Sequence, residues 1–191
     1  ISQSWEPLHH KELLKHQNDF IDFYSIDNFA ANSNPNSRTS RNLSHRIIGY
    51  LPYWQYSYYP LLDYSLLTEI NYFSAELNGQ GDIVNSHNWE NLDIVSFAHE
   101  RGVKVKLCAT LFGSTSLTTL LSNSTHRENA ISNLLNLVLL MDADGLDIDF
   151  ELLPENQRDN LVLFMQSLSD AFHEEINDPI ITMATPAVDW S

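Results

Sequence analysis

From residue 46 onward, short apolar runs alternate with longer segments of mixed polarity. Five apolar runs have the length and composition of buried strands: residues 47–53, 70–75, 103–110, 143–151 and 180–186. Three intervening segments place apolar residues three and four positions apart, which predicts helices: residues 88–101, 127–141 and 154–176. Strands that alternate with helices predict βαβ units and a parallel sheet.

The spacing of the expected strands narrows the α/β class further. Their starts at 47, 70, 103, 143 and 180 are separated by about 33 residues on average, close to the step in a (β/α)₈ barrel of ~250 residues. Gly49 stands alone in the first run, so the glycine-rich turn of a nucleotide-binding open sheet is missing. The spacing therefore favours a (β/α)₈ TIM barrel of which about the first five βα units are present, while a doubly wound open sheet that ends after the fifth strand remains an alternative.

Residues 1–45 differ from the rest of the chain. Residues 10–24 have helix-like apolar spacing, and residues 30–37 are rich in Asn, Ser and Pro, as linkers are. We predict an N-terminal extension and linker over 1–45 and a barrel domain over 46–191. Three histidines of the extension, His9, His10 and His16, are expected to be solvated, and the histidines of the chain show no metal-ligand spacing.

One apolar run, Asp144–Glu151, carries an acidic residue at every second position from Asp147 onward. Successive side chains of a strand point to opposite faces, so Asp147, Asp149 and Glu151 share one face and the apolar residues between them share the other. Each carboxylate raises the pKa of its neighbours, a cost that a strand built only for stability avoids. Glu151 lies where the strand ends and a βα loop begins, the edge where catalytic groups gather in α/β folds.

Charge and composition exclude several kinds of partner. The chain has 25 acidic and 10 basic residues and a formal net charge of -15, which argues against nucleic acid or an anionic membrane as a ligand. No apolar run approaches the ~20 residues that cross a bilayer, so no membrane span is expected. The single Cys108 excludes an internal disulfide and is expected to be a small buried side chain.

The acidic run resembles the Asp-Gly-x-Asp-x-Asp-x-Glu signature of glycoside hydrolase family 18. That family comprises chitinases and endo-β-N-acetylglucosaminidases, which carry the signature on the fourth strand of a (β/α)₈ barrel. Weaker similarities lie in the other expected strands: Ile48-Gly49-Tyr50 with Trp54, residues 67–73, and residues 182–187. Residues 108–111 depart from the family's Ser-x-Gly-Gly pattern, and Phe150 stands where tryptophan is frequent.

The resemblance assigns a role to each acid of the signature. A glycosidase needs a carboxyl that is still protonated near neutral pH, and Glu151, behind two like charges, fits the general acid/base. The resemblance implies that Asp149 hydrogen-bonds the substrate's acetamido group, that Asp147 shares a proton with Asp149, and that Asp144 supports the strand. The reaction implied is retaining, substrate-assisted hydrolysis of β-1,4 N-acetylglucosaminide linkages in chitin-like glycans.

The resemblance also implies ligands and surroundings. Substrate-binding side chains are expected at Tyr50, Trp54 and Phe73. The expected partner is an N-acetylglucosamine-containing polysaccharide or oligosaccharide, with no cofactor and no metal, and the protein is expected to be a secreted or cell-surface monomer. The remaining sixth to eighth strands of the barrel are expected beyond residue 191.

Two other functions stay open. A catalytically inactive, chitinase-like carbohydrate-binding protein would keep the barrel, but such proteins commonly lose the glutamate that Glu151 represents here. The acidic run also suits an enzyme that needs a divalent metal, although the glycine and glutamate of a calcium loop do not fall in register.

Overall fold

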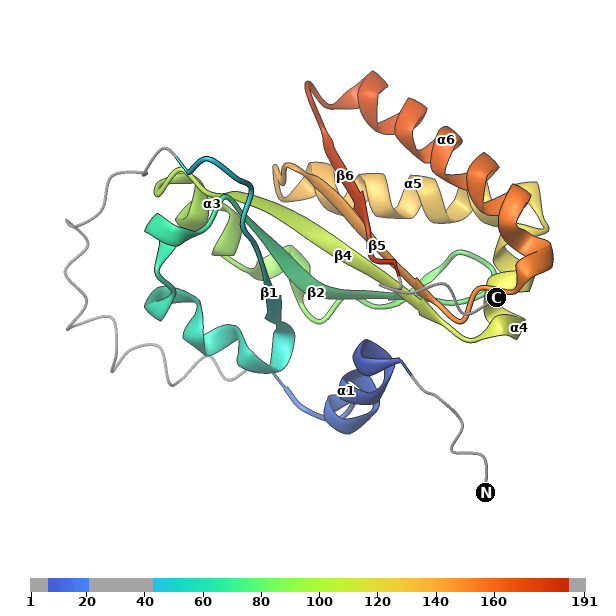
Figure 1. Cartoon of the computed structure of the whole chain (residues 1–191), viewed down its shortest axis with the longest axis horizontal. Coiled ribbons are helices and arrows are strands. Elements are labelled where there is room, and N and C mark those ends of the chain that lie inside the picture. The colour runs from blue at the N-terminus through green and yellow to red at the C-terminus, as the bar shows by residue number, and fades with distance from the viewer. Residues whose placement is uncertain (1–6, 21–42, 186–191) are drawn as a thin grey trace.

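The computed structural model describes residues 7–20 and 43–185, and its centre is a curled sheet (Figure 1). Parallel strands follow one another in the order β1-β2-β4-β5-β6, and a short β3 pairs antiparallel with the end of β2. The strands are β1 (Ile48–Pro52), β2 (Glu69–Leu77), β3 (Ile83–Asn85), β4 (Lys104–Phe112), β5 (Gly145–Glu151) and β6 (Ile180–Met183). The predicted α/β class with parallel βαβ units is confirmed.

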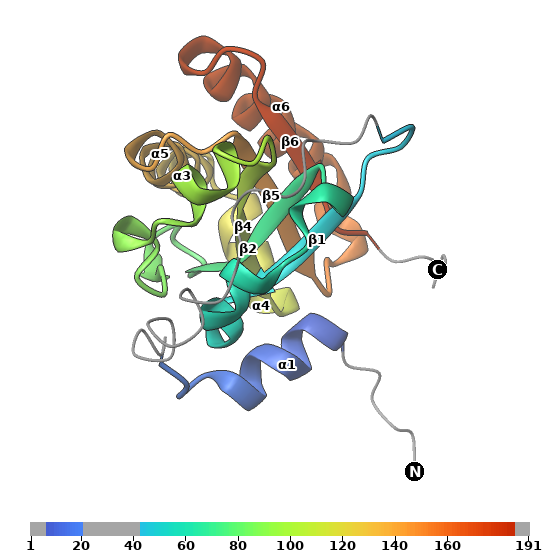
Figure 2. The ribbon, with the colours of Figure 1, turned by 90° about the vertical axis from the view of Figure 1, so that its left-hand side faces the viewer.

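Helices cover the sheet on its outer side and at one end. The α-helices are α1 (Leu8–His16), α3 (Ile94–His99), α4 (Ser114–Leu121), α5 (Ser124–Leu140) and α6 (Arg158–Glu175). The 3-10 helices are Tyr53–Leu61, Tyr64–Leu66, Trp89–Asn91 and Glu155–Gln157. α5 and α6 run side by side over the strands, whereas α1 lies across one end of the sheet (Figures 1 and 2).

The alternation along β5 separates two environments. Its apolar side chains face the helix layer, where the Phe150 ring packs against Phe164 of α6 at 5.5 Å between centroids. Phe164, Leu168 and Phe172 recur every four residues on α6 and are fully buried. Burial of these apolar side chains stabilises β5 against the helix layer by about 25 cal/mol per Å² of apolar area removed from water. The acidic side chains of β5 lie on the opposite face of the sheet.

The predicted helix over 88–101 is wrong in detail. Two shorter pieces stand there, the 3-10 helix Trp89–Asn91 and α3, with Asp93 between them. The Asp93 carboxylate accepts hydrogen bonds from the hydroxyls of Tyr56 and Tyr59, the latter at 2.7 Å. This tertiary anchor fixes a break that helical spacing alone does not reveal. Helix α4 and strand β3 were not predicted either.

Gly145 begins β5 where only glycine fits. Its φ is +154°, and a Cβ there would lie 1.9 Å from the carbonyl oxygen of Ile180 on β6. We expect Gly145→Ala to lower the free energy of unfolding by about 3 kcal/mol or more, because backbone must move to remove the overlap. Urea unfolding measures the loss, and Gly49→Ala is the control, since its Cβ would meet only the end of the Leu67 side chain at 3.3 Å. Equal losses in the two variants would contradict this account of β5.

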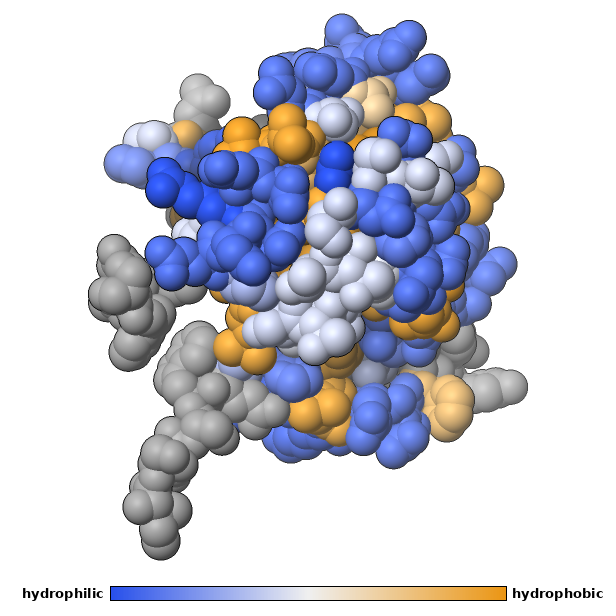
Figure 3. Space-filling model, turned by 90° about the vertical axis from the view of Figure 1, so that its right-hand side faces the viewer, coloured by the Kyte–Doolittle hydropathy of each residue, from blue (hydrophilic) through white to orange (hydrophobic). Residues whose placement is uncertain are grey.

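Figure 3 shows the molecule from the right-hand side of the view in Figure 1. This face is mostly hydrophilic, with separate apolar patches. None of the helices in the described ranges has the length and apolar character that a membrane span requires.

Candidate active site

Parallel pairing brings the acidic face of β5 to the carboxyl edge of the sheet. Asp147 lies opposite Cys108 of β4, Asp149 opposite Thr110, and Glu151 opposite Phe112, the last residue of β4. Asp147 and Asp149 are buried, whereas Glu151 is partly exposed at the strand end. The three acids therefore form a file that leads from the interior to the open edge.

Asp147 is fixed by hydroxyl donors on both of its oxygens. Tyr50 of β1 donates to one oxygen at 2.6 Å, and Thr182 of β6 donates to the other. The Thr182 hydroxyl in turn accepts a hydrogen bond of 2.7 Å from Lys106, whose fully buried ammonium lies 3.0 Å from Glu69. Sequence reasoning missed Lys106 and Thr182, because their link to Asp147 depends on strand order rather than on spacing.

Asp149 contacts the N-terminal segment. Its Oδ2 lies 2.7 Å from Nδ1 of His9 on α1, while its Oδ1 is buried without a hydrogen-bond partner among the described residues. An unsatisfied buried carboxylate oxygen is costly, and at a catalytic centre it marks a position where a ligand donor is expected. The proton shared between Asp147 and Asp149 stays a prediction.

Glu151 has the pKa of a group that exchanges protons near neutral pH. Partial burial, followed by the charge of Asp149, raises the pKa of Glu151 to about 7, against the opposing effects of His9 and of the His10 backbone N–H. That N–H donates to Oε2 of Glu151 at 3.2 Å. The Glu151 carboxyl can thus carry a proton at a pH at which an ordinary glutamate has lost it.

The three aromatic residues expected to bind substrate lie at the same edge. Trp54 and Phe73 meet edge to face at 5.8 Å between ring centroids, and Tyr50 reaches Asp147 as described. Rings of α1 cover all three: His9 packs against Tyr50 at 5.4 Å and Phe73 at 5.6 Å, and His16 stacks on Trp54 at 4.3 Å.

The expectation that His9, His10 and His16 are solvated is wrong. The side chain of His9 is 34% exposed and that of His16 is 19% exposed, because α1 folds back onto the carboxyl edge. The hydrogen bond to Asp149 is the largest influence on His9 and raises its pKa, against a smaller opposing effect of burial. The signal available in the sequence was a histidine-rich, lysine-containing helix in a strongly acidic chain.

Asp144 lies away from the other acids of the motif. It precedes β5 at the opposite edge of the sheet, where its Oδ2 accepts a 2.7 Å hydrogen bond from the backbone N–H of Val105 and lies 2.7 Å from Nε2 of His99. These contacts tie the start of β5 to β4 and α3. The supporting role of Asp144 stays a prediction.

Among the described residues, one group has the composition of a metal site. Ligand atoms of His9, Asp149 and Glu151 all lie within 4.8 Å of one another. The direct hydrogen bond between His9 and Asp149 already uses two of the atoms that an ion would need. The arrangement as it stands suits proton transfer and hydrogen bonding.

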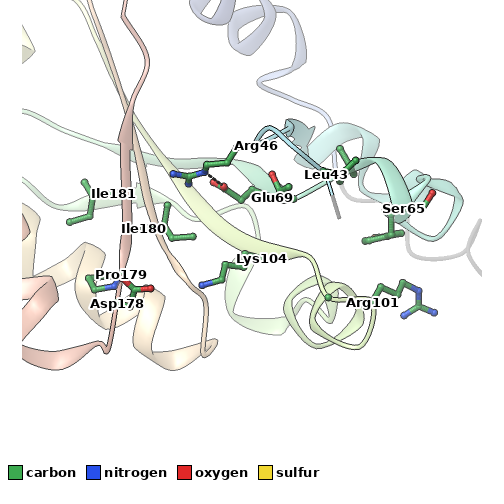
Figure 4. A pocket seen from close by; sticks show the side chains of 14 residues that line it. Leu43, Arg46, Ser65, Glu69, Arg101, Lys104, Asp178, Pro179, Ile180 and Ile181 are labelled. Atoms are coloured by element: carbon green, nitrogen blue, oxygen red, sulfur yellow. Dashed lines mark hydrogen bonds and ion pairs between the residues drawn. The ribbon is translucent and has the colours of Figure 1, made fainter. Parts of the chain in front are cut away.

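A separate pocket of about 580 Å³ lies at the amino ends of β2 and β4 (Figure 4). Its lining includes Arg46 and Glu69, which form an ion pair of 2.5 Å, together with Lys104 and Ile180. None of the signature acids from Asp147 to Glu151 lines it. The candidate active site is therefore defined by the carboxyl edge and not by this pocket.

The fold is similar to that of solved glycosidases. A chitinase from Bacteroides thetaiotaomicron matches with a TM-score of 0.63 at 23% identity, over 73% of this chain and 46% of that one. A chitinase from Cycas revoluta in complex with (GlcNAc)3 matches with a TM-score of 0.63 at 23% identity, over 72% and 45% of the two chains. A putative sporulation-specific glycosylase from Bacillus subtilis matches with a TM-score of 0.58 at 27% identity, over 68% and 44%.

The chain spans less than half the length of these structures. A search of curated proteins finds no match. The family model for glycosyl hydrolases family 18 matches residues 46–191, which contain every strand of the sheet and the whole acidic run. The predicted fold, a partial (β/α)₈ barrel, is consistent with these likenesses. The chain belongs to glycosyl hydrolases family 18.

Proposed function

We propose that the protein carrying this chain hydrolyses β-1,4 N-acetylglucosaminide linkages in chitin-like glycans, with Glu151 as general acid and base. The observation that carries the proposal is the position of Glu151 at the carboxyl end of β5 together with its pKa of about 7. Residues 46–191 are proposed as part of the catalytic barrel and residues 1–45 as an extension, in line with a family match that begins at residue 46.

In the first step, Glu151 protonates the glycosidic oxygen as the bond to the anomeric carbon breaks. The substrate's own 2-acetamido oxygen attacks that carbon and forms a cyclic oxazolinium ion. Asp149 is proposed to accept a hydrogen bond from the acetamido N–H, and its unpartnered Oδ1 is an acceptor available for it. The negative charge of Asp149 stabilises the positive charge that develops on the ring.

In the second step, Glu151 takes a proton from water, which opens the oxazolinium ion with net retention of configuration. Retention follows from two successive displacements at the anomeric carbon, first by the acetamido oxygen and then by water.

Tyr50 and Asp147 are proposed to hold this centre in place. The hydroxyls of Tyr50 and Thr182 donate hydrogen bonds to Asp147, and these bonds fix the Asp147 carboxylate next to Asp149 on the same face of β5. Trp54 and Phe73, with Tyr50, are proposed to contact the sugar rings, because aromatic faces pack well against the apolar faces of sugars.

The second candidate is an inactive carbohydrate-binding protein. The same aromatic side chains would serve it, but it has no need of a carboxyl whose pKa is raised to about 7. The presence of Glu151 therefore favours the hydrolase.

The test uses two substrates that differ at the acetamido group. The protein carrying this chain is incubated with a fluorogenic aryl chitobioside and with the matching cellobioside, which has a hydroxyl in place of the acetamido group. We expect hydrolysis of the chitobioside alone, because only that substrate supplies the internal nucleophile. Comparable hydrolysis of both would show that the protein provides its own nucleophile, and binding without hydrolysis of either would favour the carbohydrate-binding protein.

A further inference from the structure

We propose that the carboxyl edge of the sheet is an interaction surface whose occupant is the chain's own helix α1, so that residues 8–16 and the saccharide compete for the same groups. The identity of the saccharide rests on the proposed function. The occupancy itself rests on the contacts of α1.

The polar contacts of α1 go to the two acids at the open end of the file. His9 contacts Asp149 through Nδ1, and the His10 backbone N–H donates to Glu151. His10 lies in the first turn of α1, where backbone N–H groups have no partner inside the helix and favour an anion. While α1 is in place, one oxygen of each of the two acids is engaged by the extension, so a saccharide that contacts these oxygens must displace α1.

The ring contacts of α1 go to the aromatic side chains proposed to hold the sugar. The His16 ring lies parallel to the Trp54 ring, with 7° between the planes and 4.3 Å between the centroids. A flat ring stacked on an indole occupies the volume that a stacked sugar ring would fill. The Tyr53 hydroxyl donates to the His16 carbonyl at 2.7 Å and fixes the end of the helix over this place.

The docking of α1 on the carboxyl edge is weak enough to be reversible. Leu13 is its buried apolar residue, whereas Leu8 is 67% exposed and Leu14 is 46% exposed. A nine-residue helix is marginal on its own in water, so α1 depends on docking for its stability. Release therefore needs only the loss of a few polar and stacking contacts, which a saccharide can replace.

Charge favours the docked position. The groups that face His9 are the carboxyls of Asp147, Asp149 and Glu151 on β5 and the ring of Tyr50 on β1. α1 also carries Lys11 and Lys15 in a chain whose formal net charge is -15. A neutral oligosaccharide has no such attraction, so it must displace α1 through hydrogen bonds and stacking.

The experiment compares a double variant, His9→Ala with His16→Ala, against wild type in the protein carrying this chain. We expect the Kd for (GlcNAc)3, measured by calorimetry, to fall by about 10-fold, because the charge-assisted hydrogen bond and the stacked ring that hold α1 are gone. On the aryl chitobioside, KM should fall by a similar factor. The control is Leu8→Ala, an uncharged and exposed position of the same helix, which should match wild type.

A second readout does not depend on turnover. The ring resonances of His9 in the wild type, followed by NMR, should move toward those of a solvated histidine as (GlcNAc)3 saturates the site. Each of three results would overturn the proposal. These are an unchanged Kd in the double variant, His9 resonances that do not shift at saturation, and no binding of (GlcNAc)3 by either protein. Displacement of α1 by the saccharide without any hydrolysis would contradict the proposed function and would still support this inference.

Discussion

Replacement of Glu151 by glutamine is expected to lower kcat for chitooligosaccharides by about 10³-fold, while sugar binding survives. Glutamine keeps the size of the side chain and can still accept the hydrogen bond from the His10 N–H, but it cannot protonate the leaving oxygen. Steady-state kinetics on (GlcNAc)4, with calorimetry on the same samples, separates the two effects. A Glu151→Gln variant that retains more than a tenth of the wild-type rate would remove Glu151 from the role of acid.

Substrate choice provides a matched control for this variant. An aryl leaving group departs with less help from a proton than a sugar does, so the loss on the aryl chitobioside should be smaller than the loss on (GlcNAc)4. Equal losses on both substrates would indicate damage to the site in general and not the loss of an acid.

The raised pKa of Glu151 also predicts how the stability of the protein changes with pH. The folded protein holds the proton of Glu151 up to about pH 7, whereas the unfolded chain releases it around its ordinary value of 4.5. The contribution of Glu151 to stability is thus fully present below the unfolded pKa and is lost as pH rises through that window. Thermal unfolding should show Glu151→Gln more stable than wild type at about pH 8 and not at about pH 4.

Replacement of Asp149 by asparagine is the second large effect expected. The variant keeps the shape of the side chain but removes the negative charge that stabilises the oxazolinium ion, so kcat should fall by about 10²-fold. Asp149 also contacts Nδ1 of His9, so loss of the negative charge of Asp149 weakens the docking of α1. KM should therefore fall together with kcat, a combination that simple damage to the site would not produce.

Asp144→Asn is the matched control for that prediction, because it changes the same residue type in the same motif at the other end of β5. The Asp144 carboxylate accepts a hydrogen bond from the backbone N–H of Val105 and contacts His99, and neither residue belongs to the proposed substrate site. We expect kcat within about threefold of wild type and a loss of stability of about 1–3 kcal/mol. A kinetic defect in Asp144→Asn as large as that in Asp149→Asn would contradict the separation of the two ends.

The parts of the fold that follow from local pattern were predictable. The acidic run of β5 and the apolar repeat of α6 are periodic over many residues, and the structure has a strand and a helix there. The break at Asp93 was not predictable, because it depends on hydroxyls of Tyr56 and Tyr59 more than thirty positions earlier in the chain.

The candidate site divides in the same way. The alternation along β5 was enough to place Asp147, Asp149 and Glu151 on one face, and Trp54 and Phe73 followed from resemblance. The link from Lys106 through Thr182 to Asp147 requires β4, β5 and β6 to be neighbours, which spacing along the chain does not specify. The docking of α1 was missed for the reason that a short histidine-rich helix looks solvent-facing until its partners are known.

The most direct test of the central claim is the configuration of the first product. The protein carrying this chain is mixed with (GlcNAc)4, and the anomeric protons of the new reducing end are followed by NMR before mutarotation. Retention through the acetamido group predicts that the β-anomer appears first. An α-anomer as first product would show direct attack by water, and bound saccharide with no product would show a binding protein, so either result would contradict the account.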